Sequence, residues 1–94
     1  MTAYVIAEID VHDPAAYQAY VAAAPGTIAQ YGGTYRARGG AAEAFEGAAP
    51  KRTVVLEFPN ADAARRWYHS PEYTAARKLR AGCATGRLVV VEGL

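Results

Sequence analysis

The fold of this chain is decided by residues 57–73, which read Glu57-Phe-Pro-Asn-Ala-Asp-Ala-Ala-Arg-Arg-Trp-Tyr-His-Ser-Pro-Glu-Tyr73. The proline at position 59 ends a strand, and Asn60 is a typical N-cap for the short helix that follows. Ser70, with a proline directly after it, caps a second helix. Between the two caps stand three consecutive bulky side chains, Trp67, Tyr68 and His69. Aromatic and titratable groups at a break between two helices are typical of a pocket wall.

Alternating apolar residues on both sides of this segment predict strands over residues 3–11, 34–38 and 52–58. A last strand is expected over residues 87–92, and its nearly uniform apolar character predicts burial on both faces. A first helix starts after the Asp13 cap and is expected to break or kink at Pro25-Gly26. In the helix after Ser70, the inward side chains are predicted to be Tyr73, Ala76 and Leu79. Residues 39–50, rich in glycine and alanine, are predicted to form a loop or an extended arm.

The resulting order, strand–helix–strand–strand–helix–strand, is typical of the ferredoxin-like α+β fold, with a four-stranded antiparallel sheet in one domain over residues 1–94. The chain's own helices can cover only one face of such a sheet. The other face is expected to carry Tyr4, Ile6, Val55, Leu88 and Val90. Exposed apolar surface is unfavourable by roughly 25 cal/mol per Å², so this face predicts a homodimer formed sheet to sheet.

Composition excludes several classes of protein. The net charge of +1 argues against a nucleic-acid or membrane-surface binder, which would carry a clustered basic face. No segment is typical of a signal peptide or a transmembrane span. The single cysteine, Cys83, suits a reducing compartment, and we expect a cytoplasmic protein. No evident base accompanies Cys83, so a nucleophilic role is not expected.

Several motifs together resemble a known family. They include Val11-His-Asp-Pro-Ala-Ala-Tyr17, Arg38-Gly-Gly40, Val54-Val-Leu-Glu-Phe-Pro59, Trp67-Tyr-His-Ser-Pro-Glu-Tyr73 and Val91-Glu-Gly93. As a set, over nearly the whole chain, they are similar to domain of unknown function 1330, in the dimeric α+β barrel superfamily. The resemblance implies a homodimer with a cleft between sheet and helices. It implies no activity, and no catalytic residue of the superfamily's monooxygenases or haem-degrading enzymes matches a motif here.

Charged residues on the mixed faces of the strands form one candidate constellation. Strict alternation places six of them opposite the helices: Glu8, Asp10, Arg36, Arg38, Glu57 and Glu92. Guanidinium groups facing carboxylates could hold an anion or a polar substrate. The alternative is an ion-pair network that sets strand register and specifies the dimer.

A groove between sheet and helices is the predicted binding site. Its expected ligand-binding residues are Tyr20, Arg38, Trp67, Tyr68, Tyr73 and Arg80. Tyrosine-rich walls suit a flat or aromatic ligand, although tyrosine also fills volume that alanine-rich helices leave empty. Glu57 is the acid–base candidate, and His69 is a second one because histidine titrates near neutral pH. The two histidines are far apart in sequence, so neither a metal site nor a cofactor is predicted.

The leading functional hypothesis is therefore a domain that binds or transforms a small anionic or aromatic molecule in the groove of a homodimer. A non-catalytic dimeric interaction module is the alternative from a different class. A cofactor-free or haem-linked monooxygenase-like enzyme is the third. A cavity beside Trp67 would favour the first hypothesis, whereas a fully packed interior would favour the second.

Overall fold

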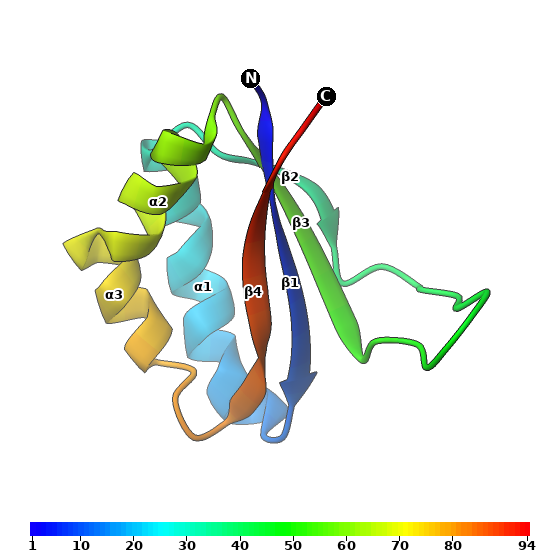
Figure 1. The fold of residues 1–94 in the computed structure, drawn as a ribbon. Helices are drawn as coiled ribbons and strands as arrows, with labels where there is room; N and C mark the ends of the chain where they lie inside the picture. The colour runs from blue at the N-terminus through cyan, green and yellow to red at the C-terminus, as the bar shows by residue number, and fades with distance from the viewer.

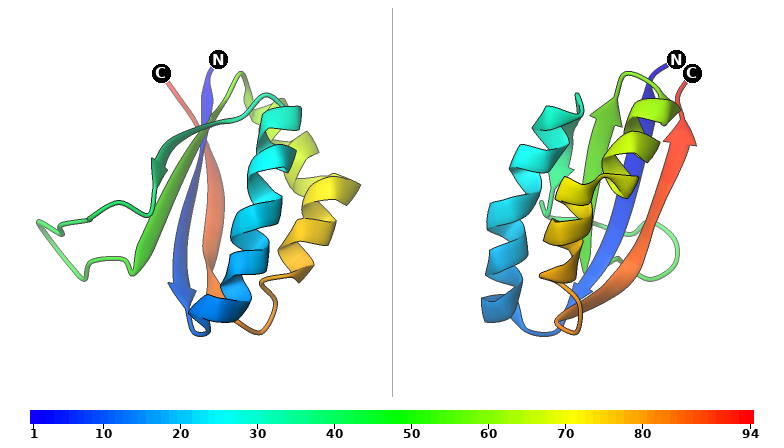
Figure 2. Two further views of the ribbon diagram at one scale, coloured as in Figure 1. Left: turned by 180° about the vertical axis from the view of Figure 1, so that it is seen from behind. Right: turned by 90° about the vertical axis from the view of Figure 1, so that its left-hand side faces the viewer.

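The computed structural model describes all residues from 1 to 94. The elements follow one another as β1 (Ala3–Val11), α1 (Pro14–Gln30), β2 (Thr34–Arg38), β3 (Arg52–Phe58), α2 (Ala61–His69), α3 (Pro71–Lys78) and β4 (Ala84–Glu92). The four strands form one antiparallel sheet in the order β2-β3-β1-β4. All three helices cover the same face of it (Figures 1 and 2). This is the predicted ferredoxin-like α+β fold. None of the helices has the length and apolar character needed to cross a membrane.

The predicted caps set the helix boundaries. The Asn60 side chain accepts a hydrogen bond from the backbone N–H of Ala63 at 2.7 Å. The Ser70 hydroxyl accepts one from the N–H of Tyr73 at 3.0 Å and donates one to the carbonyl of Trp67 at 2.6 Å. Ser70 therefore closes α2 and opens α3 at once, so the two helices meet at an angle (Figure 1).

The expected break in the first helix was wrong, because α1 runs without interruption through Pro25. A proline inside a helix removes one backbone hydrogen bond and is unfavourable by roughly 3 kcal/mol. On either side of it, Ala24 and Ile28 are buried in the core. Tertiary packing of an apolar face supplies most of the stability of helices in proteins, and here it outweighs the local penalty.

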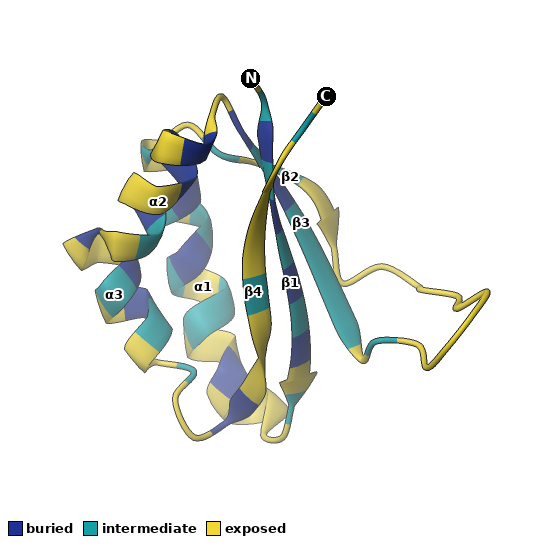
Figure 3. Cartoon of the chain, viewed as in Figure 1, coloured by how far each residue is buried: buried dark blue, intermediate teal, exposed yellow.

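The core lies between the helices and the sheet. Its most deeply buried large side chains are Trp67, Tyr73, Phe58 and Val5. The buried residues of β1 alternate along the strand, as predicted. The inward placement of Leu79 was wrong: α3 ends at Lys78, and Leu79 is 46% exposed at its C-cap. Figure 3 shows the buried residues concentrated on the facing surfaces of helices and sheet.

Strand β4 differs most from its prediction. It begins at Ala84 and is an edge strand that pairs only with β1, so it is largely exposed in the protomer (Figure 3). Leu88 and Val90 lie opposite Ala7 and Val5, which places both on the helix side of the sheet. The predicted outer face was wrong at these two positions. Its apolar residues are instead Tyr4, Ile6, Val55, Val89 and Val91.

A β-bulge in β2 corrects the predicted charge constellation. Tyr35 lies opposite Leu56 and Arg38 opposite Val54, but the register shifts between them at Arg36. A bulge adds one residue to a strand and so reverses the side on which every later side chain lies. Arg36 thus stays on the outer face, whereas Arg38 joins the helix side. Glu92, opposite the buried Ala3, also leaves the predicted cluster.

Residues 39–50 form a projecting arm between β2 and β3. The backbone N–H of Gly39 donates to the carbonyl of Thr53 at 2.8 Å and closes the base of the arm. Beyond it, residues 40–49 are exposed, and the Phe45 side chain is 91% exposed. Figures 1 and 2 show that the arm extends on the side of the sheet away from the helices.

Candidate functional site

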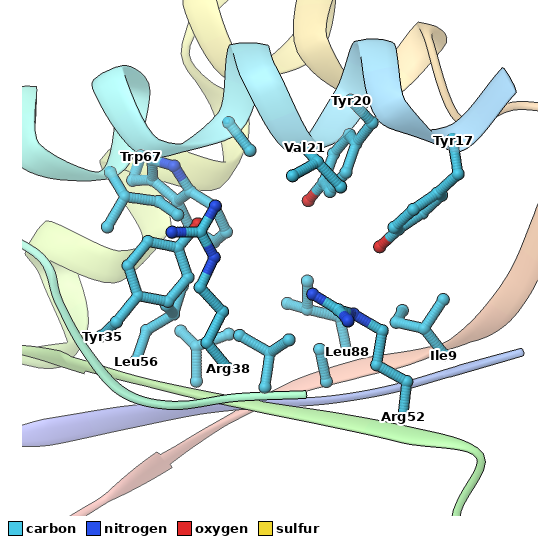
Figure 4. Close-up of a pocket in the computed structure, with 15 residues that line it drawn as sticks. Ile9, Tyr17, Tyr20, Val21, Tyr35, Arg38, Arg52, Leu56, Trp67 and Leu88 are labelled. Carbon is cyan, nitrogen blue, oxygen red and sulfur yellow. The ribbon is translucent and has the colours of Figure 1, made fainter. Parts of the chain in front are cut away.

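A small cavity lies between α1 and the sheet, with a volume of about 40 Å³ (Figure 4). Strand side chains form its floor: Val5, Ala7, Ile9, Val54, Leu56 and Leu88. Helix α1 forms its roof with Tyr17, Tyr20, Val21, Ala24 and Ile28. Trp67 closes one end, and Tyr35, Arg38 and Arg52 complete the lining. The cavity is therefore apolar inside, with its charges at the side of β2 and β3.

Arg38 and Arg52 are the only charged groups that line this cavity. Figure 4 shows both guanidinium groups pointing from the sheet into the space below α1. The Arg38 guanidinium carbon lies 4.6 Å from the centre of the Tyr35 ring, and that of Arg52 lies 5.9 Å from the Tyr17 ring. Neither arginine has a carboxylate partner, because the ion pairs of the chain are Arg36–Glu57, Arg65–Asp62 and Arg87–Glu8. Two unneutralised cations thus face an apolar space.

The hydrogen-bonding capacity of Arg52 is incompletely used, as is that of Arg80, which lies outside the cavity lining. Three buried side-chain polar atoms of the chain lack a partner, and they include Nε of Arg52 and Nε of Arg80. A buried donor without a partner is unfavourable by about 1–3 kcal/mol. Such groups commonly mark a site that a ligand or an ordered water completes.

Tyrosines from α1 and α3 form a hydroxyl-bearing wall beside the cavity. The hydroxyls of Tyr20 and Tyr73 share a hydrogen bond of 2.7 Å. The Arg80 guanidinium carbon lies 5.4 Å from the centre of the Tyr20 ring. Burial raises the pKa of Tyr20 well above its usual value, with a smaller contribution from Tyr73. Burial also raises the pKa of Tyr17, against the opposing effect of Arg52. Both hydroxyls therefore stay protonated and act as hydrogen-bond donors at neutral pH.

The structure brings some predicted binding residues together and separates others. Tyr20, Arg38 and Trp67 line the cavity. Tyr73 is fully buried behind Tyr20, so it supports the wall rather than contacting the cavity. Arg80 stands with it in this second layer. Burial alone would lower the pKa of Arg80. The nearby hydroxyls of Tyr73 and Tyr20 raise it by more, so the pKa of Arg80 is raised overall.

Tyr68 and His69 lie elsewhere, along a second groove between α2 and β4. Its volume is about 150 Å³, and its lining also includes Trp67. The Tyr68 hydroxyl accepts a hydrogen bond from Arg77, whose guanidinium carbon lies 4.6 Å from the Tyr68 ring centre. His69 is exposed and packs edge-on against Tyr68 at a centroid distance of 5.2 Å.

Glu57 does not reach either cavity. It lies opposite Tyr4 on the outer face of the sheet, and its carboxylate accepts a hydrogen bond from Nε of Arg36 at 3.1 Å. The sheet therefore separates the predicted acid–base residue from the groove residues that it was expected to serve. This ion pair joins β2 to β3, and a separate pair, Glu8–Arg87, joins β1 to β4. Both are compatible with the alternative interpretation, in which the charges set strand register.

Three aromatic or charged lining residues were missing from the predicted site: Tyr17, Tyr35 and Arg52. A signal was present for Arg52, because the alternation of β3 places it on the same side as Val54 and Leu56. For Tyr17 the signal was its spacing: it lies three residues before Tyr20 in α1, and this spacing places both side chains on one face of the helix. The alternation of β2 places Tyr35 on the helix side of the sheet. Only the bulge brings Arg38 to the same side, next to Tyr35.

The chemistry available in the cavity is restricted to hydrogen bonding and positive charge. No carboxylate, histidine or cysteine lines it. The chain contains no cluster of three or more His, Cys, Asp or Glu side chains that could hold a metal ion. Cys83 is buried between α3 and β4, where its thiol is 3.4 Å from the carbonyl of Arg80. The cavity is therefore suited to holding an anion beside an apolar group, without a general base of its own.

Comparison with known proteins places the chain in a family and a fold. The family described as domain of unknown function (DUF1330) matches residues 2–94. Among curated proteins, nothing matched the sequence. Among solved structures, a protein of unknown function from Rhodopseudomonas palustris is 19% identical, with a TM-score of 0.79 over 99% of this chain and 82% of that one.

Two further solved structures have the same fold. SnoaB, a cofactor-independent oxygenase from Streptomyces nogalater, is 16% identical, with a TM-score of 0.69 over 99% of this chain and 93% of that one. A dimeric protein of unknown function from Bacteroides fragilis, described as having a ferredoxin-like fold, is 17% identical. Its TM-score is 0.58 over 98% of this chain and 95% of that one.

Proposed function

The chain belongs to the DUF1330 family, and we propose that it binds a small planar anion, such as an aromatic carboxylate or phenolate, in the cavity between α1 and the sheet. The observation that carries this proposal is the pair of guanidinium groups, Arg38 and Arg52, which line an apolar cavity without any carboxylate partner. A guanidinium presents a planar fork of donors that matches a carboxylate.

Each part of such a ligand has a counterpart in the cavity. The anionic oxygens accept hydrogen bonds from Arg52, including the buried Nε that has no partner within the chain. The ring rests on the apolar strand floor, between the tyrosines and Trp67. Aromatic rings lining a pocket favour flat ligands, and a few polar groups then fix the orientation.

Ligand entry requires movement at the mouth. A volume of about 40 Å³ accommodates roughly three waters, because each needs at least about 10–15 Å³. An aromatic ring is larger than this. The side chains that restrict the space are Tyr35 and Arg38, which lie on the edge strand β2, and Arg38 is exposed. The mouth therefore opens by side-chain rotation, without disturbing the buried core around Trp67.

The proposal is tested by measuring benzoate binding by calorimetry, with neutral benzamide as the isosteric comparison. Arg38→Ala is expected to weaken benzoate binding at least tenfold and to leave benzamide binding unchanged. Arg36→Ala is the matched control: it stands two residues away in the same strand, but it faces the outer side and pairs with Glu57. Equal benzoate affinity in Arg38→Ala and wild type would refute the proposal, as would equal losses in both variants.

We further propose that the functional unit is a homodimer formed through the outer face of the sheet. Supporting this, Val89 and Val91 are 45% and 47% exposed on that face, beside Ile6 and Val55. The structurally similar protein from Bacteroides fragilis is dimeric. Sedimentation velocity tests this proposal: a stable monomer at micromolar concentration would contradict it, whereas Val89→Lys is expected to yield monomers.

A second candidate function is a cofactor-independent oxygenase, the activity for which SnoaB is described. The cavity holds no base that titrates near neutral pH, but two guanidinium groups would favour the ionised form of a bound phenol or enol. Such an electron-rich anion can react with oxygen, with the substrate itself supplying the electrons. Oxygen uptake with an ionisable polycyclic phenol tests this candidate. Uptake that is equal in wild type and in Arg38→Ala would exclude a role for this cavity.

A further inference from the structure

The arm and the groove between α2 and β4 have complementary features. The arm presents Phe45, which is 91% exposed although it is the arm's only large apolar residue. The groove has an apolar lining that includes Ala64, Trp67, Leu88 and Val90, and its volume is about 150 Å³. An apolar cavity of about 150 Å³ engineered in another protein binds benzene, so the groove is large enough for a phenyl ring.

The charges on the two segments also match. Glu43 and Glu46 flank Phe45, and residues 39–50 contain no basic residue. Arg65 and His69 stand on the α2 side of the groove, where Arg65 also forms an exposed ion pair with Asp62 at 2.7 Å. An acidic segment with a central aromatic residue therefore complements a groove whose rim carries an arginine and a histidine. Complementary charges at the rim of an interface guide association and fix its register.

Within one chain, the arm and the groove between α2 and β4 do not contact each other. The arm leaves the sheet on the side opposite the helices (Figures 1 and 2). The groove is lined by α2 and by Leu88 and Val90, which lie on the helix side of the sheet. An extended chain spans about 3.4 Å per residue, so the six residues from Gly39 to Phe45 reach about 20 Å. Packed sheets are about 10 Å apart. The arm is therefore long enough to pass the sheet of a second copy and reach the layer behind it.

We propose that Phe45 of one copy inserts into the groove between α2 and β4 of a second copy. This rests on the proposed outer-face dimer. With the strand order β2-β3-β1-β4, a two-fold axis parallel to the strands places the β2 edge of one sheet opposite the β4 edge of the other. The arm that follows β2 then emerges beside the partner's groove. Because an isologous dimer repeats each contact, both grooves are filled at once.

This contact would act on the ligand site. Trp67, Val5 and Leu88 line both the groove and the ligand cavity. The arm of one copy thus packs against the back of the wall whose front faces the ligand in the other copy. Each cavity is complete only in the dimer.

The experiment is cross-linking between copies. An Ala44→Cys protein, which retains Phe45, is mixed with a ¹⁵N-labelled His69→Cys protein and treated with a short bismaleimide, and mixed-isotope dimers are counted by mass spectrometry. We expect at least tenfold more mixed dimer than with Ala22→Cys in place of His69→Cys, because Ala22 is exposed on α1, a different helix. The wild-type chain, with its buried Cys83, controls for background. Equal yields with His69→Cys and Ala22→Cys would overturn the proposal.

Two further measurements separate the remaining outcomes. If an Ala44→Cys/His69→Cys double variant cross-links only within one chain at high dilution, the arm folds back and the proposal is wrong. Trp67 is the chain's only tryptophan, so Phe45→Ala is expected to shift its emission to longer wavelength, and Phe45→Leu to shift it less. An unchanged spectrum in a protein that sedimentation shows to be dimeric would reject the arm contact but retain the dimer. A monomeric wild type would reject both.

Discussion

Replacing Arg52 by methionine is expected to stabilise the protein and weaken ligand binding together. Arg52 lies in β3 on the helix side of the sheet, with a buried Nε that has no partner in the chain. It has no carboxylate partner either. Methionine retains the apolar stem, which packs along the cavity, and removes the guanidinium. The exchange therefore isolates the polar head group.

The magnitude follows from two opposing effects. Removing a buried, unpaired donor is favourable by about 1–3 kcal/mol. The lower end applies, because the Arg52 residue is partly exposed. Against this, the guanidinium carbon lies 5.9 Å from the Tyr17 ring centre, and losing such a cation–π contact removes about 0.5–1 kcal/mol. The net stabilisation is up to about 0.5 kcal/mol, which corresponds to a rise in Tm of up to about 4 °C for a domain of this size.

Urea unfolding followed by Trp67 fluorescence, without ligand, measures the change in stability. Calorimetry measures benzoate affinity, which is expected to fall roughly 10- to 100-fold, because a hydrogen bond to a charged group contributes about 1.5–3 kcal/mol. If Arg52→Met instead lowers the free energy of unfolding by more than about 1 kcal/mol, Arg52 has a structural role and the expected stabilisation is wrong. Unchanged benzoate affinity would refute the assignment of Arg52 to the ligand site.

Three further substitutions test separate parts of the structure. Gly39→Ala is expected to destabilise the protein by about 1–2 kcal/mol and to weaken benzoate binding, because Gly39 has a φ of +70° and an added Cβ would displace the Arg52 guanidinium. Gly40→Ala, whose Cβ would meet open space, is the control. Calorimetry should show unchanged benzoate affinity for it, and urea unfolding should show unchanged stability. Burial raises the pKa of Tyr20 above 10, so the folded protein holds this proton after the unfolded chain has lost it, and stability is expected to fall above pH 10. Tyr20→Phe should reduce that fall by up to about 1.4 kcal/mol per pH unit in urea titrations, and an identical slope in both proteins would contradict the assignment. Glu57→Gln should leave benzoate affinity unchanged and alter stability by less than about 1 kcal/mol, since Glu57 lies across the sheet from the cavity; a tenfold loss of affinity would contradict this placement.

Local signals in the sequence predicted the elements well. Asn60 and Ser70 accept the backbone hydrogen bonds expected of helix caps, and the bounds of β2 and β3 match the alternating segments. Such features depend on residues within a few positions of one another. The first helix is a counter-example: the local preference of Pro25 was overridden by packing against a core that the sequence does not display directly.

The side on which a residue lies was harder to predict, because it depends on register between strands. In β4, nearly every residue is apolar, so periodicity could not distinguish Leu88 and Val90 from Val89 and Val91. Only pairing with β1 places the first two toward the helices. Arg52 was overlooked for a related reason: an arginine at the start of a strand suggests a solvated end, whereas pairing with Ile9 places it over the core side.

The bulge at Arg36 gives two neighbouring arginines opposite roles. In a regular strand, Arg36 and Arg38 would share the outer face with Glu57 and Glu8, and the two arginines could pair with the two carboxylates there. The extra residue turns Arg38 to the other side of the sheet, where no carboxylate lines the cavity. Arg36 is neutralised by Glu57, whereas Arg38 keeps an uncompensated charge beside apolar and aromatic groups. Because Arg38 is also exposed to solvent, its charge stays hydrated until an anion enters the cavity and accepts hydrogen bonds from the guanidinium fork. The β-bulge that made strict alternation misleading in β2 is therefore the feature on which the proposed affinity for an anion depends.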